Sequence, residues 1–272
     1  MTRLIQDDVV KIAPALEEYN AELVRMTGCS LREIAAYAVG RKVGEDYAQK
    51  PKVAVIPMTC GQGIIEGFVE SVASIISYLG FDAVITKSRD AGGVAEAVQN
   101  GSEILFMADD DRFVAVNLRT GKVSDNGAAT GKGYMTGLMH MCDGLEGKKV
   151  LVIGAGPVGT GAALALIRFG AEVSIYDIDL SASQRLAGEL IKQGYAATIE
   201  IDLEGALGRH CILVDACPTE DFIMLRHISA DTMIAAPGIP LGVQVAGVAQ
   251  ISNRLLHDPL QIGVATMFFD VL

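Results

Sequence analysis

The residues with the clearest chemical meaning form a glycine-rich turn in the second half of the chain. An apolar run, residues 150–153, leads into Gly154, Gly156 and Gly159, a helix-like stretch follows, and a second apolar segment ends at Asp177. Gly154 permits a tight strand-to-helix turn, Gly156 lets backbone approach a pyrophosphate, and Gly159 lets the helix pack closely on the strand. The helix N-terminus favours an anion, and the later carboxylate can bind both adenosine ribose hydroxyls. The pattern predicts a β-α-β unit for NAD, since the 2′-phosphate of NADP would meet like charge.

A second candidate is the run of three acids Asp109, Asp110 and Asp111, which follows the apolar segment 104–107. Carboxylates can hold an ammonium group, accept its proton and stabilise positive charge that develops nearby. The alternation of side chains along a strand predicts Asp109 and Asp111 on one side and Asp110 on the other, so at most two reach one site. A solvated turn or a helix cap is the alternative for this acidic cluster.

Two glycine-rich segments are candidates for binding a substrate carboxylate. Residues 58–63, with Thr59, Gly61 and Gly63, follow the first predicted strand and open a predicted helix, whose N-terminus can cradle an anion. Residues 126–131 offer backbone N–H groups beginning at Asn126, although a tight helix start explains the same sequence. Lys132 is either a carboxylate ligand, a catalytic lysine or a surface charge.

Around these residues the hydrophobic pattern indicates two α/β units. Residues 1–48 are predicted helical, with a capping box formed by Ser30 and Glu33. Strands and helices then alternate from residue 53 to residue 107, which is typical of a parallel sheet. Strand 113–117 follows, and a helix over 127–141 links this unit to the second one. The fold class is therefore α/β with two domains: N-terminal helices and a small α/β module over 1–143, a Rossmann domain over 144–262, and an apolar end, 263–272.

In a doubly wound sheet the ligand lies at the carboxyl ends of the strands. Two later strands, 211–216 and 233–236, stop at proline turns that should border the nicotinamide. The residues predicted to bind the cofactor are Gly154, Ala155, Gly156, Pro157, Val158, Gly159, Asp177, Ala216, Cys217, Pro218, Pro237 and Gly238.

Composition excludes several classes of protein. The formal net charge of −11 leaves no basic patch for nucleic acid or anionic membranes, and no run is long and uncharged enough to span a bilayer. The five cysteines form no C-x-x-C pair and no usual metal spacing, which favours reduced thiols in the cytoplasm and no metal site. The apolar end should pack on the first domain or on a partner subunit, and together with the N-terminal helices it favours a homodimer.

Three segments, 56–65, 106–117 and 125–134, resemble in order and spacing the pyrrolysine-forming dehydrogenase family, PylD, and the likeness covers essentially the whole chain. The resemblance implies that the enzyme uses NAD to oxidise the terminal ornithine amine of a small dipeptide-like substrate, lysine-Nε-(3-methyl-D-ornithine). Loss of ammonia and ring closure then give pyrrolysine. Two alternatives stay open. One is a dehydrogenase of the shikimate or methylenetetrahydrofolate type, which would rely on lysine or histidine chemistry; the other is an NAD-binding protein without catalysis.

Overall fold

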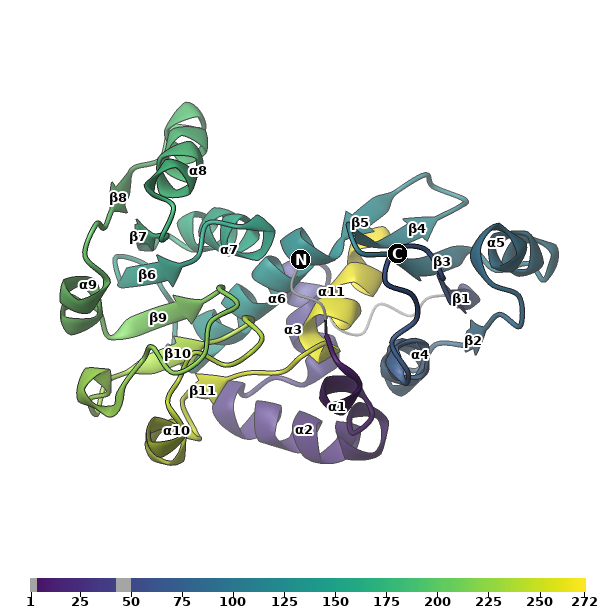
Figure 1. Ribbon diagram of the computed structural model, residues 1–272, viewed down its shortest axis with the longest axis horizontal. Helices are drawn as coiled ribbons and strands as arrows, with labels where there is room; N and C mark the ends of the chain where they lie inside the picture. The colour runs from purple at the N-terminus through teal and green to yellow at the C-terminus, as the bar shows by residue number, and fades with distance from the viewer. Residues whose placement is uncertain (1–3, 43–49) are drawn as a thin grey trace.

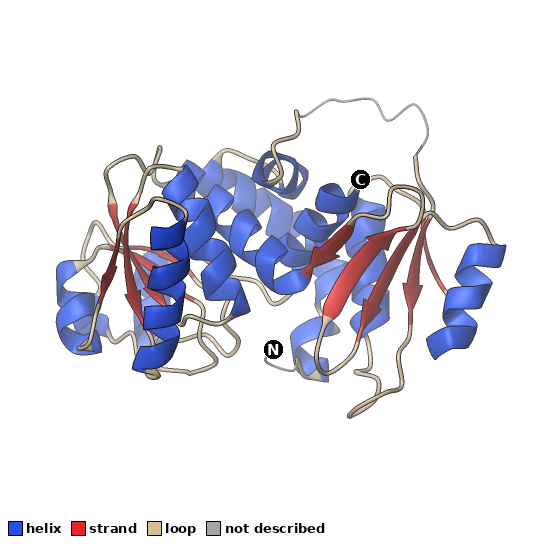
Figure 2. Ribbon diagram, turned by 90° about the horizontal axis from the view of Figure 1, so that it is seen from above, coloured by secondary structure: helices blue, strands red, loops and turns tan. Residues whose placement is uncertain are grey.

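Two β-sheets lie on either side of a central group of helices in the computed structural model, which describes residues 4–42 and 50–272 (Figures 1 and 2). This arrangement confirms the predicted two-part α/β fold with a helical N-terminus. No helix among the described residues is long and apolar enough to cross a membrane.

The N-terminal helices are α1 (Gln6–Val9), α2 (Ile12–Thr27) and α3 (Leu31–Ala38). Ser30 and Glu33 form the predicted capping box at the start of α3. Gly28, with φ of 73°, ends α2 in the left-handed region. The buried faces of α2 and α3 pack on helices of the same chain, so they need no second subunit for burial. The predicted helical region 1–48 also included residues 1–3 and 43–48, which lie outside the described part of the chain.

The first sheet has the strand order β2-β1-β3-β4-β5. Its strands are β1 (Val53–Ile56), β2 (Ala83–Ile85), β3 (Ile104–Ala108), β4 (Phe113–Asn117) and β5 (Val123–Asp125). The first three are parallel, joined by α4 (Phe68–Tyr78) and α5 (Asp90–Gln99), as the alternating pattern predicted. β4 and β5 are antiparallel, since the short connection 109–112 allows a hairpin but no crossover.

The second sheet is parallel throughout, in the order β8-β7-β6-β9-β10-β11. Its strands are β6 (Lys149–Ile153), β7 (Glu172–Tyr176), β8 (Ala197–Ile199), β9 (Ile212–Asp215), β10 (Met233–Ala235) and β11 (Leu255–Leu256). Its helical elements are α7 (Pro157–Arg168), α8 (Leu180–Lys192), α9 (Leu203–Arg209), the 3-10 helix η1 (Leu225–His227) and α10 (Val245–Ile251). This is the Rossmann order 3-2-1-4-5-6, which reverses between β6 and β9 and places a ligand crevice at their carboxyl ends.

Two helices join the halves, α6 (Asn126–Met141) and α11 (Gln261–Val271). α6 crosses α7 so closely that a Cβ on Gly131 would overlap the backbone of Gly161 and Ala162. α11 is almost wholly buried against α3, α4, α6 and the first sheet. The apolar end of the chain is thus covered by the first domain, and the homodimer stays a prediction without support from this segment.

Candidate active site

The glycine turn has the backbone geometry that a dinucleotide requires. Gly154 lies at φ of 100°, a conformation that L side chains rarely adopt. A Cβ on Gly159 would overlap the carbonyl oxygen of Gly154, whereas one on Gly156 would meet nothing within 4 Å. Gly156 caps α7 without a side-chain hydrogen bond, and Pro157 occupies the first turn. The turn is therefore closed where the helix meets the strand and open where a pyrophosphate would lie, so the residues fit the cofactor.

A cavity of about 390 Å³ adjoins this turn. Asp177 lines it, and this carboxylate accepts hydrogen bonds from the N–H of Ala155 at 2.7 Å and of Asp179 at 2.8 Å. Of the other predicted cofactor residues, Gly154, Gly156, Ala216, Cys217 and Pro218 also line this cavity. We call this cavity the dinucleotide groove.

The second proline turn lies beside the first, held to it by a buried acid. Gly238 donates its N–H to the carbonyl oxygen of Asp215 at 2.8 Å, and a Cβ on Gly238 would overlap the carbonyl oxygen of Cys217. Pro237 precedes it on a partly exposed stretch and does not line the groove. The fold thus brings the two predicted turns together at the carboxyl ends of β9 and β10.

The acids 109–111 occupy a hairpin turn between β3 and β4. The Oδ1 of Asp109 accepts the N–H of Asp111 at 2.9 Å and of Arg112 at 2.7 Å, and Asp109 N–H donates to the carbonyl oxygen of Arg112. Asp109 and Asp110 line one small cavity, of about 120 Å³, and Asp111 does not. The expected pairing of Asp109 with Asp111 is therefore wrong, because the turn ends the strand alternation.

The loop 58–63 lies against this hairpin. Asp110 Oδ2 accepts the N–H of Gln62 at 2.7 Å, and a Cβ on Gly61 would overlap the Asp110 carboxylate. The sequence had suggested that this segment opens a helix, and that prediction is wrong. Gly61, Gly63 and Gly67 all have positive φ, and α4 begins only at Phe68. Gly63 lines the small cavity.

Thr59 is placed differently from its glycine neighbours. It is held by Asp90, whose carboxylate accepts its N–H at 2.7 Å and its hydroxyl at 2.5 Å, and it does not line the small cavity.

The start of α6 connects the acid hairpin with the glycine turn. The Arg112 guanidinium donates to Asp125 Oδ2 at 3.1 Å, and Asp125 caps α6 by accepting the N–H of Gly127. A Cβ on Gly127 would meet Pro157, the first residue of α7. The two candidate sites are thus joined through Arg112, Asp125 and Gly127.

Comparison with known proteins decides the family. A family model described as the N-terminal domain of pyrrolysine biosynthesis protein PylD matches residues 8–124, and one described as the alanine dehydrogenase/PNT C-terminal domain matches residues 125–240. The chain is 31% identical to the pyrrolysine synthase of Methanosarcina acetivorans and 32% identical to that of Methanosarcina barkeri. These alignments cover all of this chain and 100% and 98% of the relatives. The chain belongs to the pyrrolysine synthase family.

Solved structures agree with a dehydrogenase fold. Quinate dehydrogenase from Corynebacterium glutamicum, in complex with NAD, superposes with a TM-score of 0.55 at 14% identity over 82% of this chain and 93% of that one. Shikimate dehydrogenase from Aquifex aeolicus gives a TM-score of 0.53 at 17% identity over 81% of this chain and 92% of that one. At such identities the likeness concerns the fold alone.

In this member of the pyrrolysine synthase family, two predicted substrate residues at α6 have partners within the protein. Asn126 is the first residue of α6, and its Oδ1 accepts the Thr130 hydroxyl at 3.2 Å, so the segment is a helix start and its binding of a substrate carboxylate stays a prediction. Lys132 forms an ion pair with Asp270 of α11 at 3.3 Å and lines neither cavity. The described residues hold no group of three or more side chains suited to a metal ion.

Sequence reasoning missed several residues that the fold adds to the groove. Ile178, which is 94% exposed, lies beside Asp177, and Leu203, Thr219 and Phe222 complete the wall. Asp215, which contacts Cys217 behind the groove without lining it, was hidden within an apolar strand; it is fully buried, and desolvation raises its pKa. A lone acid in an otherwise apolar strand was the signal that could have found it.

Proposed function

We propose that this protein is a pyrrolysine synthase that uses NAD to oxidise the terminal ornithine amine of lysine-Nε-(3-methyl-D-ornithine). Ammonia is then released and the pyrroline ring closes. The observation that carries the proposal is the chain of contacts from the acid hairpin to the glycine turn. It consists of the Arg112–Asp125 hydrogen bonds, the capping of α6 by Asp125, and the packing of Gly127 on Pro157. These contacts link the hairpin that carries the acids to the first residue of the helix that follows the glycine turn, which supports a site shared by an amine and a dinucleotide.

The acids supply what amine oxidation needs from the protein. An ammonium group has no lone pair, so its proton must leave before the neighbouring carbon can lose hydride. Asp109 and Asp110, which share one cavity, hold the ammonium, and one of them takes its proton. Bound NAD supplies the hydride acceptor. The carboxylates also stabilise the iminium charge that forms on the substrate, and water then converts that iminium to an aldehyde with loss of ammonia.

The rest of the small cavity suits an aliphatic chain. Most of its lining is apolar, including Leu4 from the N-terminal segment, Ile64 and Phe68. An apolar wall with two acids on its edge binds an alkyl amine through burial of its carbon chain and through the charge at its end. This combination supports a branched amino alkyl substrate over a polyol.

The acid at the end of β7 supports NAD over NADP. Asp177 presents its carboxylate to the dinucleotide groove, where ribose hydroxyls would donate to it and a 2′-phosphate would be repelled.

The decisive experiment mixes the purified protein, NAD and the isopeptide amine and follows the appearance of reduced nicotinamide absorbance. Asp110→Asn should lower kcat/KM by about 100-fold, in the range for loss of a general base. Asp111→Asn is the matched control, because Asp111 lies outside the cavity, and it should stay within about threefold of wild type.

Each alternative gives a different result. A shikimate-type enzyme would reduce NAD with a hydroxy acid and would tolerate Asp110→Asn. A protein that binds NAD without catalysis would produce no reduced nicotinamide with either class of substrate.

A further inference from the structure

One wall of the dinucleotide groove is a single irregular segment, residues 217–227, which follows β9. Cys217, Pro218, Thr219 and Phe222 of this segment line the groove. Apart from the short η1 at its end, no helix or strand orders it. Backbone hydrogen bonds of Ile223 with Gly242 and Gln244, at 2.9 and 3.0 Å, hold its middle, and side-chain contacts hold its two ends.

Asp215 anchors the beginning of the segment. This fully buried carboxylate accepts the N–H and the thiol of Cys217 on Oδ1, at 3.4 and 3.3 Å, and the N–H of Gly242 on Oδ2, at 2.8 Å. The donors come from two different loops, 217–218 and 238–242. A buried carboxylate is stable only while such donors surround it, so the acid and the two loops hold one another in place.

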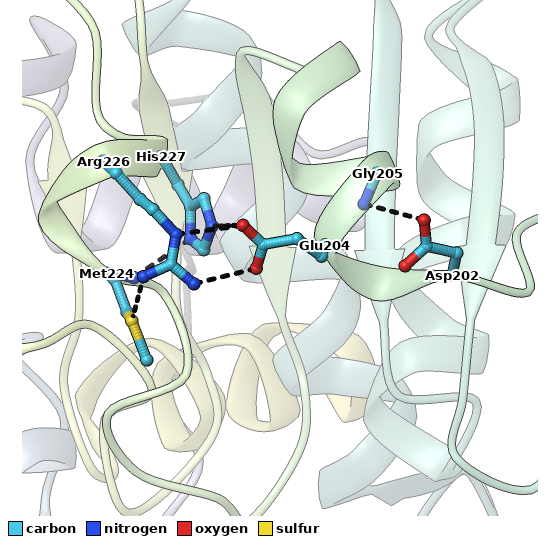
Figure 3. A network of polar contacts seen from close by, with 6 residues as sticks. All are labelled: Asp202, Glu204, Gly205, Met224, Arg226 and His227. Carbon is cyan, nitrogen blue, oxygen red and sulfur yellow. Dashed lines mark hydrogen bonds and ion pairs between the residues drawn. The ribbon is translucent and has the colours of Figure 1, made fainter.

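Glu204 of α9 anchors the end of the segment (Figure 3). Its carboxylate accepts Arg226 Nε at 2.9 Å and Nη2 at 3.0 Å, and His227 Nε2 lies 3.1 Å from Oε1. The His227 side chain is only 4% exposed, and its Nδ1 accepts the N–H of Met224. The neighbour of Glu204, Leu203, lines the groove, so this network joins two parts of the same wall.

We propose that Asp215 and Glu204 are positioning residues, which hold segment 217–227 in the shape that binds the dinucleotide. The proposal rests on the function proposed above. Neither residue lines the groove; each acts through the segment that it fastens. If an anchor is removed, the segment samples other conformations, and the cofactor must then order it on binding, which lowers affinity.

The substitutions Asp215→Asn and Glu204→Gln test the two anchors. An amide offers one acceptor oxygen, so in Asp215→Asn the new NH₂ faces a donor of Cys217 or Gly242, and a hydrogen bond is lost. In Glu204→Gln the side chain keeps its size and loses its charge. Glu103→Gln is the matched control for a surface ion pair, since Glu103 pairs with Arg119 at 3.3 Å in the first domain. Leu190→Ala, at a fully buried position of α8, is the control for general destabilisation.

Two measurements are made on each full-length variant without the amine substrate. Titration with NADH should show a dissociation constant raised about tenfold in Asp215→Asn and about threefold in Glu204→Gln. Hydrogen exchange of the free protein should be faster in peptides spanning 217–227 in both variants. Neither control should change the affinity, and Leu190→Ala should not speed exchange selectively in that segment, even though it lowers Tm.

The proposal is overturned if both anchor variants bind NADH as wild type does, or if Leu190→Ala loosens the segment equally. Should Asp215→Asn fail to fold, the exposed Glu204 decides the matter by the same two readouts. If the wild-type protein itself does not bind NADH, the proposed function fails instead, and the exchange comparison still shows whether the two acids hold the segment.

Discussion

The proposed binding sites at the carboxyl edges of the two sheets are built differently. At the second sheet the site is made of glycine backbone: Gly154 and Gly159 bring helix and strand together, and Gly156 leaves space for a pyrophosphate. At the first sheet, the edge presents the carboxylates of Asp109 and Asp110 beside an apolar cavity. A site made of backbone follows from residue type and spacing, whereas a site made of side chains depends on how each turn aims them. The site at the second sheet is accordingly the easier of the two to identify from sequence.

The largest effect is expected at the glycine turn. In Gly159→Ala the added Cβ overlaps the Gly154 carbonyl oxygen and pushes α7 away from β6. The affinity for NADH should fall by about 100-fold, the scale of a displacement near 1 Å in a binding geometry. Gly188→Ala is the control: this glycine lies in α8 with nothing within 4 Å, so binding should not change. Equal affinity of both variants would show that the turn does not hold the cofactor.

An intermediate effect is expected at Asp177. Asp177→Asn removes the charge that repels a 2′-phosphate and weakens the ribose hydrogen bonds, so the ratio of KM values for NAD and NADP should shift about tenfold toward NADP. Asp179→Asn, two residues later, removes a nearby charge while its side-chain oxygen can still cap α8, and it should leave the ratio unchanged. A wild-type enzyme that prefers NADP would contradict the assignment outright.

The smallest effect is expected at Lys132, in the connecting helix α6. Since Lys132 pairs with Asp270, Lys132→Met and Asp270→Asn should each lower the free energy of unfolding by no more than about 1 kcal/mol. Both should keep kcat/KM within about threefold of wild type. Denaturant unfolding and steady-state rates measure the two quantities. A large loss of activity in Lys132→Met alone would restore the predicted role of this lysine in substrate binding.

The same contrast explains which sequence-based expectations failed. The hairpin 109–112 was treated as an extension of a strand, but the hydrogen bond from Asp109 N–H to Arg112 carbonyl oxygen turns the chain and brings Asp110 into the cavity. Residues 58–63 were taken for a helix start, and two glycines with positive φ, Gly61 and Gly63, instead make a loop that Asp110 holds. Both errors concern turns, where one hydrogen bond redirects a side chain and local periodicity carries no information.

The amino-acid sequence alone determined the α/β class and the glycine turn with its acid at Asp177, because hydrophobic period and glycine spacing are properties of neighbouring residues. Tertiary structure decided the rest. It placed two of three adjacent acids in a cavity, paired Lys132 with Asp270 from the far end of the chain, and made Asp215 the contact between two loops. These arrangements join residues that are distant in the chain, and only the packing of the two sheets around α6 and α11 fixes which of them meet.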